Sequence, residues 1–515
     1  MATKDQLNAL QTVITENLRV QRGGADAIGY IDISNALAKT NSKQNHVIFG
    51  RRGCGKSLLL QESRRTLDGK TKVIYLNCED FKNHSFPNVL IEILDSIFEE
   101  LEKHVTGWFG RKRRCKQVLI SIRQNLSSLK EQADERTSKV KETQTSENSN
   151  TLATGASVLD KQINLSYSDK NATKAAIEKE YEQADSKIHR LNLLLVEIKK
   201  QIREVFELST SVKAVFIQLD DFYHLPRIFQ PHVTDYIHRL CKDVPLYFKI
   251  ATLRHASVLF ADRKGQLTGA QERHDYQPLN VDFTLQDVGK TEKQLKQIFH
   301  AFAKKAGMSA EEFDKLFKGE GFRRLALAGG GVPRDCLSIL VELISNSEGS
   351  VDRIGKDDIR AMSFTNFEHR IEELKTDSEQ SEQDSLLKGI YVLREFCLNK
   401  GNNIFMVSER TLREHDNLKE LINRLLDYRI IHSVGTAYTH KSRSGSYEAF
   451  MIDIGSYAFL RKLHGKLIEV DLFDGTAKDK IRAAPIVDEK DLEKMWKNTP
   501  GQLQAHLLSD GAPDH

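Results

Sequence analysis

The chain has 515 residues, which is too long for one ordinary hydrophobic core and corresponds to about three domains. Hydrophobic residues make up 39% and charged residues 29%, and the formal net charge of +4 neither requires nor excludes a nucleic-acid partner. Six widely spaced cysteines without a C-x-x-C pair argue against a zinc site or a disulfide framework, and no apolar run approaches the roughly 20 residues that span a bilayer. We therefore expect a cytoplasmic protein without stable membrane insertion.

The first strong pattern is an apolar run at residues 46–49, followed by Gly-x-x-x-x-Gly-Lys-Ser and a leucine-rich helical pattern. This order predicts a strand, a phosphate-binding loop and a helix. Lys56 supplies a charge for the β- and γ-phosphates, and the Ser57 hydroxyl is placed to ligate Mg²⁺. The expected nucleotide-binding residues are Gly50, Arg51, Arg52, Gly53, Cys54, Gly55, Lys56, Ser57 and Leu58. We therefore expect the chain to bind a nucleoside triphosphate.

Further strands are predicted at residues 72–77, 212–219 and 246–252, which indicates an α/β sheet. The segment 102–209 interrupts this alternation. It contains two heptad-patterned helices that flank a polar stretch at 137–173. The pattern favours an inserted helical hairpin, a coiled coil with a flexible tip. It leaves open whether the hairpin projects from the nucleotide domain or packs on its core.

Two strand ends carry polar residues suited to phosphate chemistry. Asp220 and Asp221 end one strand, where the first carboxylate is expected to hold Mg²⁺ and the second to orient or deprotonate the attacking water. Thr252 and Arg254 end the next strand and are candidates for contact with the γ-phosphate or the water. Because the second position is Asp and not the longer Glu, we expect slow hydrolysis.

Downstream, the run Gly-Gly-Gly-Val-Pro-Arg opens a helix, with Pro333 suited to its first turn. If a helical bundle folds over the nucleotide, Arg334 projects from this helix toward the γ-phosphate. Alone, the same residues describe an ordinary helix start with an exposed arginine.

The C-terminal third predicts an acidic linker at 376–383, then helices, then a β-hairpin, which is the chain order of a winged helix. The recognition helix is expected at residues 418–428 and the wing tip at 438–445. The possible DNA contacts are Lys419, Arg424, Lys441 and Arg443. The same domain type also serves as a protein-interaction module or a closed-state clasp. The basic run at 111–114, beside Trp108 and Phe109, is a second candidate for contact with nucleic acid or a membrane surface.

Together the phosphate loop, Leu219-Asp220-Asp221, Thr252-x-Arg254 and the Gly-Val-Pro-Arg334 helix resemble an AAA+ ATPase. The most similar branch is that of origin-recognition and archaeal replication-initiator proteins, and the Thr-Leu-Arg element also resembles STAND signalling ATPases. The resemblance covers about residues 25–100 and 210–460. The chain departs from the family in its Asp-Asp pair, in the missing sensor Asn and in the insertion.

Patterns in the sequence itself predict the inserted helical hairpin at 102–209 and a polar, loosely ordered tail at 471–515. The resemblance implies a P-loop α/β core with a parallel sheet, at residues 1–101 and 210–290, a helical lid at 291–375 and a winged helix at 376–470. It also implies a homo-oligomer whose sites are completed by an arginine from the neighbouring subunit. Candidates for that arginine are Arg263, Arg273 and Arg239.

Three functions follow as expectations. The first is an ATPase that hydrolyses ATP with Mg²⁺ and assembles on double-stranded DNA. The second is a STAND-like signalling or defence switch, in which ATP releases a clasp so that a protein effector can be engaged. The third is a scaffold that binds nucleotide and hardly turns it over.

Overall fold

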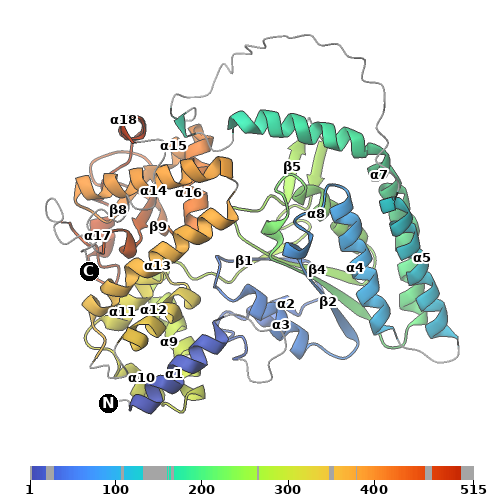
Figure 1. Cartoon of the computed structure of the whole chain (residues 1–515), viewed down its shortest axis with the longest axis horizontal. Helices are drawn as coiled ribbons and strands as arrows, with labels where there is room; N and C mark the ends of the chain where they lie inside the picture. The colour runs from blue at the N-terminus through green and yellow to red at the C-terminus, as the bar shows by residue number, and fades with distance from the viewer. Residues whose placement is uncertain are drawn as a thin grey trace, which may run out of the picture.

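The computed structural model describes residues 3–18, 28–105, 110–131, 159, 162–163, 167–263, 266–346, 353–378, 380–458 and 467–499. Most of the segment predicted as a flexible tip lies outside these residues, as do Trp108, Phe109 and the last part of the tail. The described elements form two bodies in contact, an α/β core and a helical and C-terminal body (Figure 1).

The α/β core is built on a five-stranded parallel sheet with the order β2-β3-β4-β1-β7. Its strands are β1 (His46–Phe49), β2 (Thr71–Asn77), β3 (Ala214–Asp220), β4 (Leu246–Thr252) and β7 (Gln277–Asn280). Since all neighbours run parallel, every strand ends at the same side, which we call the carboxyl edge, and starts at the opposite amino edge. Open α/β sheets bind ligands at the carboxyl edge.

The sequence patterns missed β7 and a small hairpin, β5 (Phe260–Arg263) with β6 (Gln266–Gly269). β7 is short and carries polar residues and Pro278, so its sequence lacks an apolar run. Proline is tolerated there because β7 is the outer strand of the sheet and pairs only with β1.

Helices cover both faces of the sheet. On one face, α2 (Ala36–Thr40) and α3 (Lys56–Thr66) bury residues such as Leu59 and Leu60 against Ile48. On the other face lie α4 (Asn88–His104) and α8 (Gln230–Cys241).

The insertion continues this second helical layer through α5 (Arg111–Glu131) and α7 (Tyr167–Leu208), which lie beside α4 in Figure 1. Leu119, Ile122 and Leu126 are buried in the same core as α4, and Arg123 pairs with Asp95 at 2.9 Å. Of the two readings of the insertion, the structure therefore supports packing on the core for α5 and for the described side chains of α7.

A second body follows the sheet and is mainly helical. Its helical layer comprises α9 (Val288–Lys305), α10 (Ala310–Asp314), α11 (Gly321–Ala328), α12 (Pro333–Asn346) and α13 (Lys356–Asp377). The N-terminal helix α1 (Lys4–Asn17) packs on α9 and α12, so it belongs to this body and not to the α/β core that the sequence analysis assigned it to.

The C-terminal domain shares one hydrophobic core with that layer. It comprises α14 (Gln380–Lys400), β8 (Ile404–Ser408), α15 (Glu409–Glu414), α16 (Asp416–Asp427), β9 (Ile431–Tyr438) and β10 (Tyr447–Ile452). Its three strands form an antiparallel sheet with the order β8-β10-β9.

Two expectations about this region are wrong. The acidic stretch is not an extended linker, because α13 runs to Asp377 and α14 starts at Gln380, and its carboxylates pair with arginines. The tail is also ordered as far as Thr499. It contains α17 (Ala477–Ile481) and α18 (Glu489–Asn498), it buries Trp496, and it bonds both backbone groups of Met406 in β8.

The described helices include none with the length and apolar character needed to cross a membrane.

Candidate functional site

The phosphate loop lies where β1 ends and α3 begins, at the carboxyl edge of the sheet (Figure 1). Gly53 and Gly55 have positive φ values of 83° and 88°, which side chains rarely adopt, and Gly55 precedes the first residue of α3. A Cβ atom at Gly55 would meet only the ring of Tyr30, at 3.7 Å, so the loop leaves space over the helix start. This is the backbone cradle that a phosphate group requires.

Lys56 is buried inside this loop, and burial lowers its pKa. Its ammonium donates to the loop carbonyls of Gly50, at 2.8 Å, and Arg51, at 3.3 Å. The Asp221 carboxylate is the charge that most opposes the lowering of this pKa. Neutral carbonyls are weak partners for a buried ammonium, so phosphate oxygens suit Lys56 better than its present partners do.

Asp220 is buried at the end of β3, where burial and the Asp221 carboxylate raise its pKa. It is hydrogen-bonded by Ser57 and by the hydroxyl of Tyr75, which donates to Oδ2 at 2.8 Å. The hydroxyl and the carboxylate that the sequence assigned to Mg²⁺ are therefore next to each other. Oxygen ligands of this kind suit Mg²⁺.

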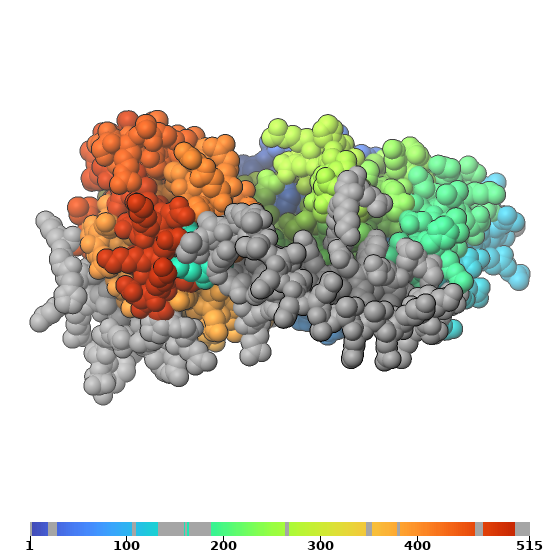
Figure 2. Space-filling view, turned by 90° about the horizontal axis from the view of Figure 1, so that it is seen from above, coloured from blue at the N-terminus to red at the C-terminus, as the bar shows by residue number. Residues whose placement is uncertain are grey.

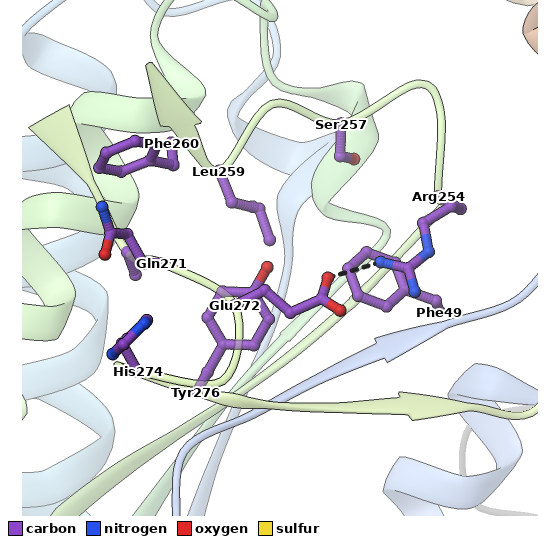
Figure 3. Close-up of a pocket in the computed structure, with 10 residues that line it drawn as sticks. Phe49, Arg254, Ser257, Leu259, Phe260, Gln271, Glu272, His274 and Tyr276 are labelled. Atoms are coloured by element: carbon purple, nitrogen blue, oxygen red, sulfur yellow. Dashed lines mark hydrogen bonds and ion pairs between the residues drawn. The ribbon is translucent and has the colours of Figure 1, made fainter. Parts of the chain in front are cut away.

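Thr252 and Arg254, at the end of β4, both have partners within the chain. The Thr252 hydroxyl is buried and hydrogen-bonds to that of Ser257. Arg254 stacks over the Phe49 ring, with its Cζ atom 4.0 Å from the ring centroid, and pairs with Glu272 at 2.7 Å. Figure 3 shows this pair at the side of a cavity of about 460 Å³.

Arg334, at the start of α12, lies over the phosphate loop. A Cβ atom added to Gly53 would come within 2.7 Å of the Arg334 Cβ, so the absence of a side chain at Gly53 permits this approach. Within the described part of the chain, Arg334 has no carboxylate partner, whereas Arg51 pairs with Asp282 at 2.7 Å and Arg52 pairs with Asp377. The guanidinium of Arg334 is thus available to an anion bound in the loop.

A buried network of charges joins the loop to the C-terminal domain. Arg429, which is 1% exposed, donates to the Arg52 carbonyl at 3.0 Å and to Asp335 of α12 at 3.3 Å. Arg370 of α13 bonds the same Asp335 at 3.0 Å and also pairs with Asp453. Asp335 is shared by the two arginines, which also pair with Asp453 and Glu373, so removing any one of these ions weakens the charge compensation of the others.

Helix α16 of the C-terminal domain docks directly on the α/β core. The Asp427 carboxylate accepts hydrogen bonds from the backbone N–H groups of His255, at 3.2 Å, and Ala256, at 2.8 Å, in the loop after β4. Glu420 of the same helix pairs with Arg227. Burial raises the pKa of Asp427 to about 7. Helix α16 therefore contacts the loop that follows β4 directly.

The residues proposed for DNA contact are not presented together. Arg424 is buried and pairs with Glu382 at 2.6 Å, whereas Lys419 is exposed on the same helix. Lys441 and Arg443 each lie 3.8 Å from a carboxylate of the tail. In this arrangement α16 does not offer a free face to a DNA groove.

The three arginines proposed to act in a neighbouring subunit are also dispersed. Arg263 ends β5, and Arg273 lies exposed in the turn before β7 with a positive φ of 68°. Arg239 pairs with Asp235 at 2.8 Å and donates to Asn192 of α7 at 2.9 Å.

Sequence reasoning missed Tyr75, Asp282 and the network around Arg429. No local motif marks them, because each acts on the loop from a distant segment. The only available signal was that Tyr75 and Asp220 lie near the ends of strands predicted for one sheet.

Comparison with models of known protein families finds none that matches this chain, and comparison with curated proteins finds no significant match.

Proposed function

We propose that this chain binds ATP with Mg²⁺ at the phosphate loop. The observation that carries the proposal is the convergence on one loop of the Lys56 ammonium, the Ser57–Asp220 pair and the unpaired guanidinium of Arg334. Ser57 and Asp220 would hold the metal, and Lys56 and Arg334 would hold the phosphates. Bound Mg²⁺ would neutralise charge on the β- and γ-phosphates.

We further propose that the nucleotide controls the docking of the C-terminal domain, as in a STAND-like switch. Three contacts favour this over direct DNA reading by α16: Asp427 on the β4 loop, Glu420 on Arg227, and Arg429 on the Arg52 carbonyl. A γ-phosphate could attract Arg334 at the start of α12 and reorder the loop around Arg52. Arg429 contacts both of these segments, through Asp335 and the Arg52 carbonyl, so its contacts would change when the nucleotide binds.

The other functions remain predictions. Assembly on DNA through a winged helix requires α16 to undock first. Slow hydrolysis follows from the short Asp221 side chain, and single-turnover rates of Asp221→Glu compared with the parent would test it. An unchanged or lower rate in the variant would count against this explanation.

Hydrogen exchange tests the switch directly, because the amides of His255 and Ala256 are covered by Asp427. We expect these amides to exchange slowly with ADP and much faster with a slowly hydrolysed ATP analogue. Lys56→Ala should abolish the difference between the two nucleotides. Equal exchange with both nucleotides in the parent would overturn the switch, and failure to bind either would overturn the ATP site.

Mass measurement in solution, with each nucleotide and with or without duplex DNA, tests the proposed homo-oligomer. A mass increase with the ATP analogue alone supports nucleotide-driven assembly. An increase that needs an added protein effector supports the signalling form of the switch.

A further inference from the structure

The amino edge of the sheet, opposite the phosphate loop, collects positive charge from separate segments. We call it the basic edge and define it by residues from the end of α3, the starts of β2 and α5 and the residue before β3: Arg64, Lys70, Lys72, Arg111, Lys112, Arg113 and Lys213. Lys72 is half-buried and the others are exposed.

Hydrogen bonds and electrostatic contacts place these segments together. The Lys213 amide donates to the Lys70 carbonyl at 2.8 Å, which sets the two lysines beside each other. His104, at the end of α4, is close enough to Lys72 and Arg64 for both charges to help lower its pKa, after burial. Ser211 donates to the His104 carbonyl at 3.4 Å, and α5 packs on α4.

The cations of the basic edge lack a carboxylate partner in the part of the chain that the structure describes. Among the described residues none of the seven has a carboxylate partner within ion-pair distance, whereas nearby Arg114 pairs with Glu204 and Lys116 with Glu102. The nearby acid Asp68 accepts hydrogen bonds from the Lys70 and Thr71 amides. Like charges gathered on one edge repel one another, and a bound anion would relieve this repulsion.

We propose that the basic edge binds the phosphate backbone of double-stranded DNA. Spaced cations on rigid elements suit the backbone of a duplex, bound without regard to sequence. Anionic membrane surfaces and single strands carry similar negative charge, and the binding measurements below distinguish them from duplex.

This site is independent of the ATP site and of the C-terminal domain. The proposed DNA contact therefore lies at the amino edge of the parallel sheet, and not at Lys441 and Arg443 of the C-terminal domain. DNA would then bind while α16 stays docked (Figure 2 shows the C-terminal domain and the blue helix α5 of the insertion at opposite ends of the molecule).

Fluorescence anisotropy with a labelled 30-base-pair duplex tests the proposal on the full chain. The first variant combines Lys70→Gln with Lys213→Gln, the second combines Arg111→Gln, Lys112→Gln and Arg113→Gln, and the matched control combines Lys441→Gln with Arg443→Gln. All are surface substitutions, and thermal melting checks that each variant is folded.

We expect both basic-edge variants to weaken binding at least tenfold. The slope of log affinity against log salt should fall by about one for each DNA phosphate that the variant no longer neutralises. The control should bind as the parent does. Loss of binding in the control alone, no binding by the parent at low salt, or preference of the parent for anionic vesicles or single strands over duplex would each overturn the proposal.

Discussion

At the carboxyl edge of the sheet, Arg51, Arg52 and Arg429 are each paired with a carboxylate, whereas the cations of the basic edge on the opposite side have no such partner among the described residues. Both edges are rich in arginine and lysine, so composition does not distinguish them. The difference lies in the partners that the fold supplies. At the carboxyl edge Lys56 and Arg334 lack a carboxylate partner among the described residues, and we propose that they bind the nucleotide. At the amino edge all seven cations of the basic edge share this lack of a partner.

The largest expected effect comes from breaking the buried network at the carboxyl edge. Asp335→Ala removes a buried carboxylate that Arg370 and Arg429 share, while Asp453 and Glu373 still pair with them. We therefore expect a cost of about 3 kcal/mol, the lower end of the range for a broken buried ion pair. Chemical denaturation should show this loss in the free energy of unfolding. Glu272→Ala, which removes the more exposed pair with Arg254, is the control and should cost about 1 kcal/mol or less. Equal losses of unfolding free energy in the two variants would contradict the difference between buried and exposed ion pairs.

Lys56→Ala should have the next largest effect, now on ligand binding. Removal of a charge-assisted hydrogen bond to phosphate is expected to cost roughly 1.5–3 kcal/mol, or about 10- to 150-fold in ATP affinity, measured by calorimetry. DNA affinity should not change, because the basic edge lies on the other side of the sheet. Parallel loss of both affinities would show that the two edges are not independent.

The docking of α16 should depend on pH through Asp427. Its pKa is about 7 when docked and about 3.9 when free in solvent, so the docked form holds the proton more tightly. Docking is therefore strongest below about pH 4, weakens as the pH rises toward 7, and then levels off. Asp427→Asn keeps the acceptor oxygen without the charge, so exchange of the His255 and Ala256 amides, corrected for the intrinsic pH effect, should lose this dependence. A retained dependence would assign it to another group.

Tyr75→Phe should give the smallest effect. It removes the hydroxyl that orients Asp220 and keeps the ring, at a cost of about 1 kcal/mol. We expect a severalfold higher Mg²⁺ concentration for half-maximal ATP binding, with unchanged metal-free binding. A general loss of stability without a shift in the Mg²⁺ dependence would make the hydrogen bond merely structural.

Local patterns predicted what local chemistry determines. The glycines of the phosphate loop and the apolar strands ending at Phe49 and Asp220 are recognisable from a few consecutive residues. They predicted an α/β fold with a parallel sheet, and the observed sheet confirms it. β7 gave no such signal because an edge strand tolerates polar residues and proline.

Ion pairs between residues that are far apart in the sequence could not be predicted from local patterns. The acidic stretch suggested a linker because the arginines that neutralise it, Arg52 and Arg424, lie far away in sequence. For the same reason Arg254, Arg424 and Lys441 were expected to meet ligands, and each instead meets a carboxylate of its own chain. A cation's availability is a property of the folded structure and cannot be read from its position in a motif.

The two hydrogen bonds that Met406 makes with the tail have a practical consequence. The Met406 amide donates to the Pro485 carbonyl and its carbonyl accepts from the Val487 amide, so the tail covers the outer side of β8. An uncovered strand of this kind, with the buried sequence Ile-Phe-Met-Val, is a template on which other chains add strands. A version truncated near residue 470 should therefore aggregate, and recombinant work on this protein should retain the chain at least to Thr499.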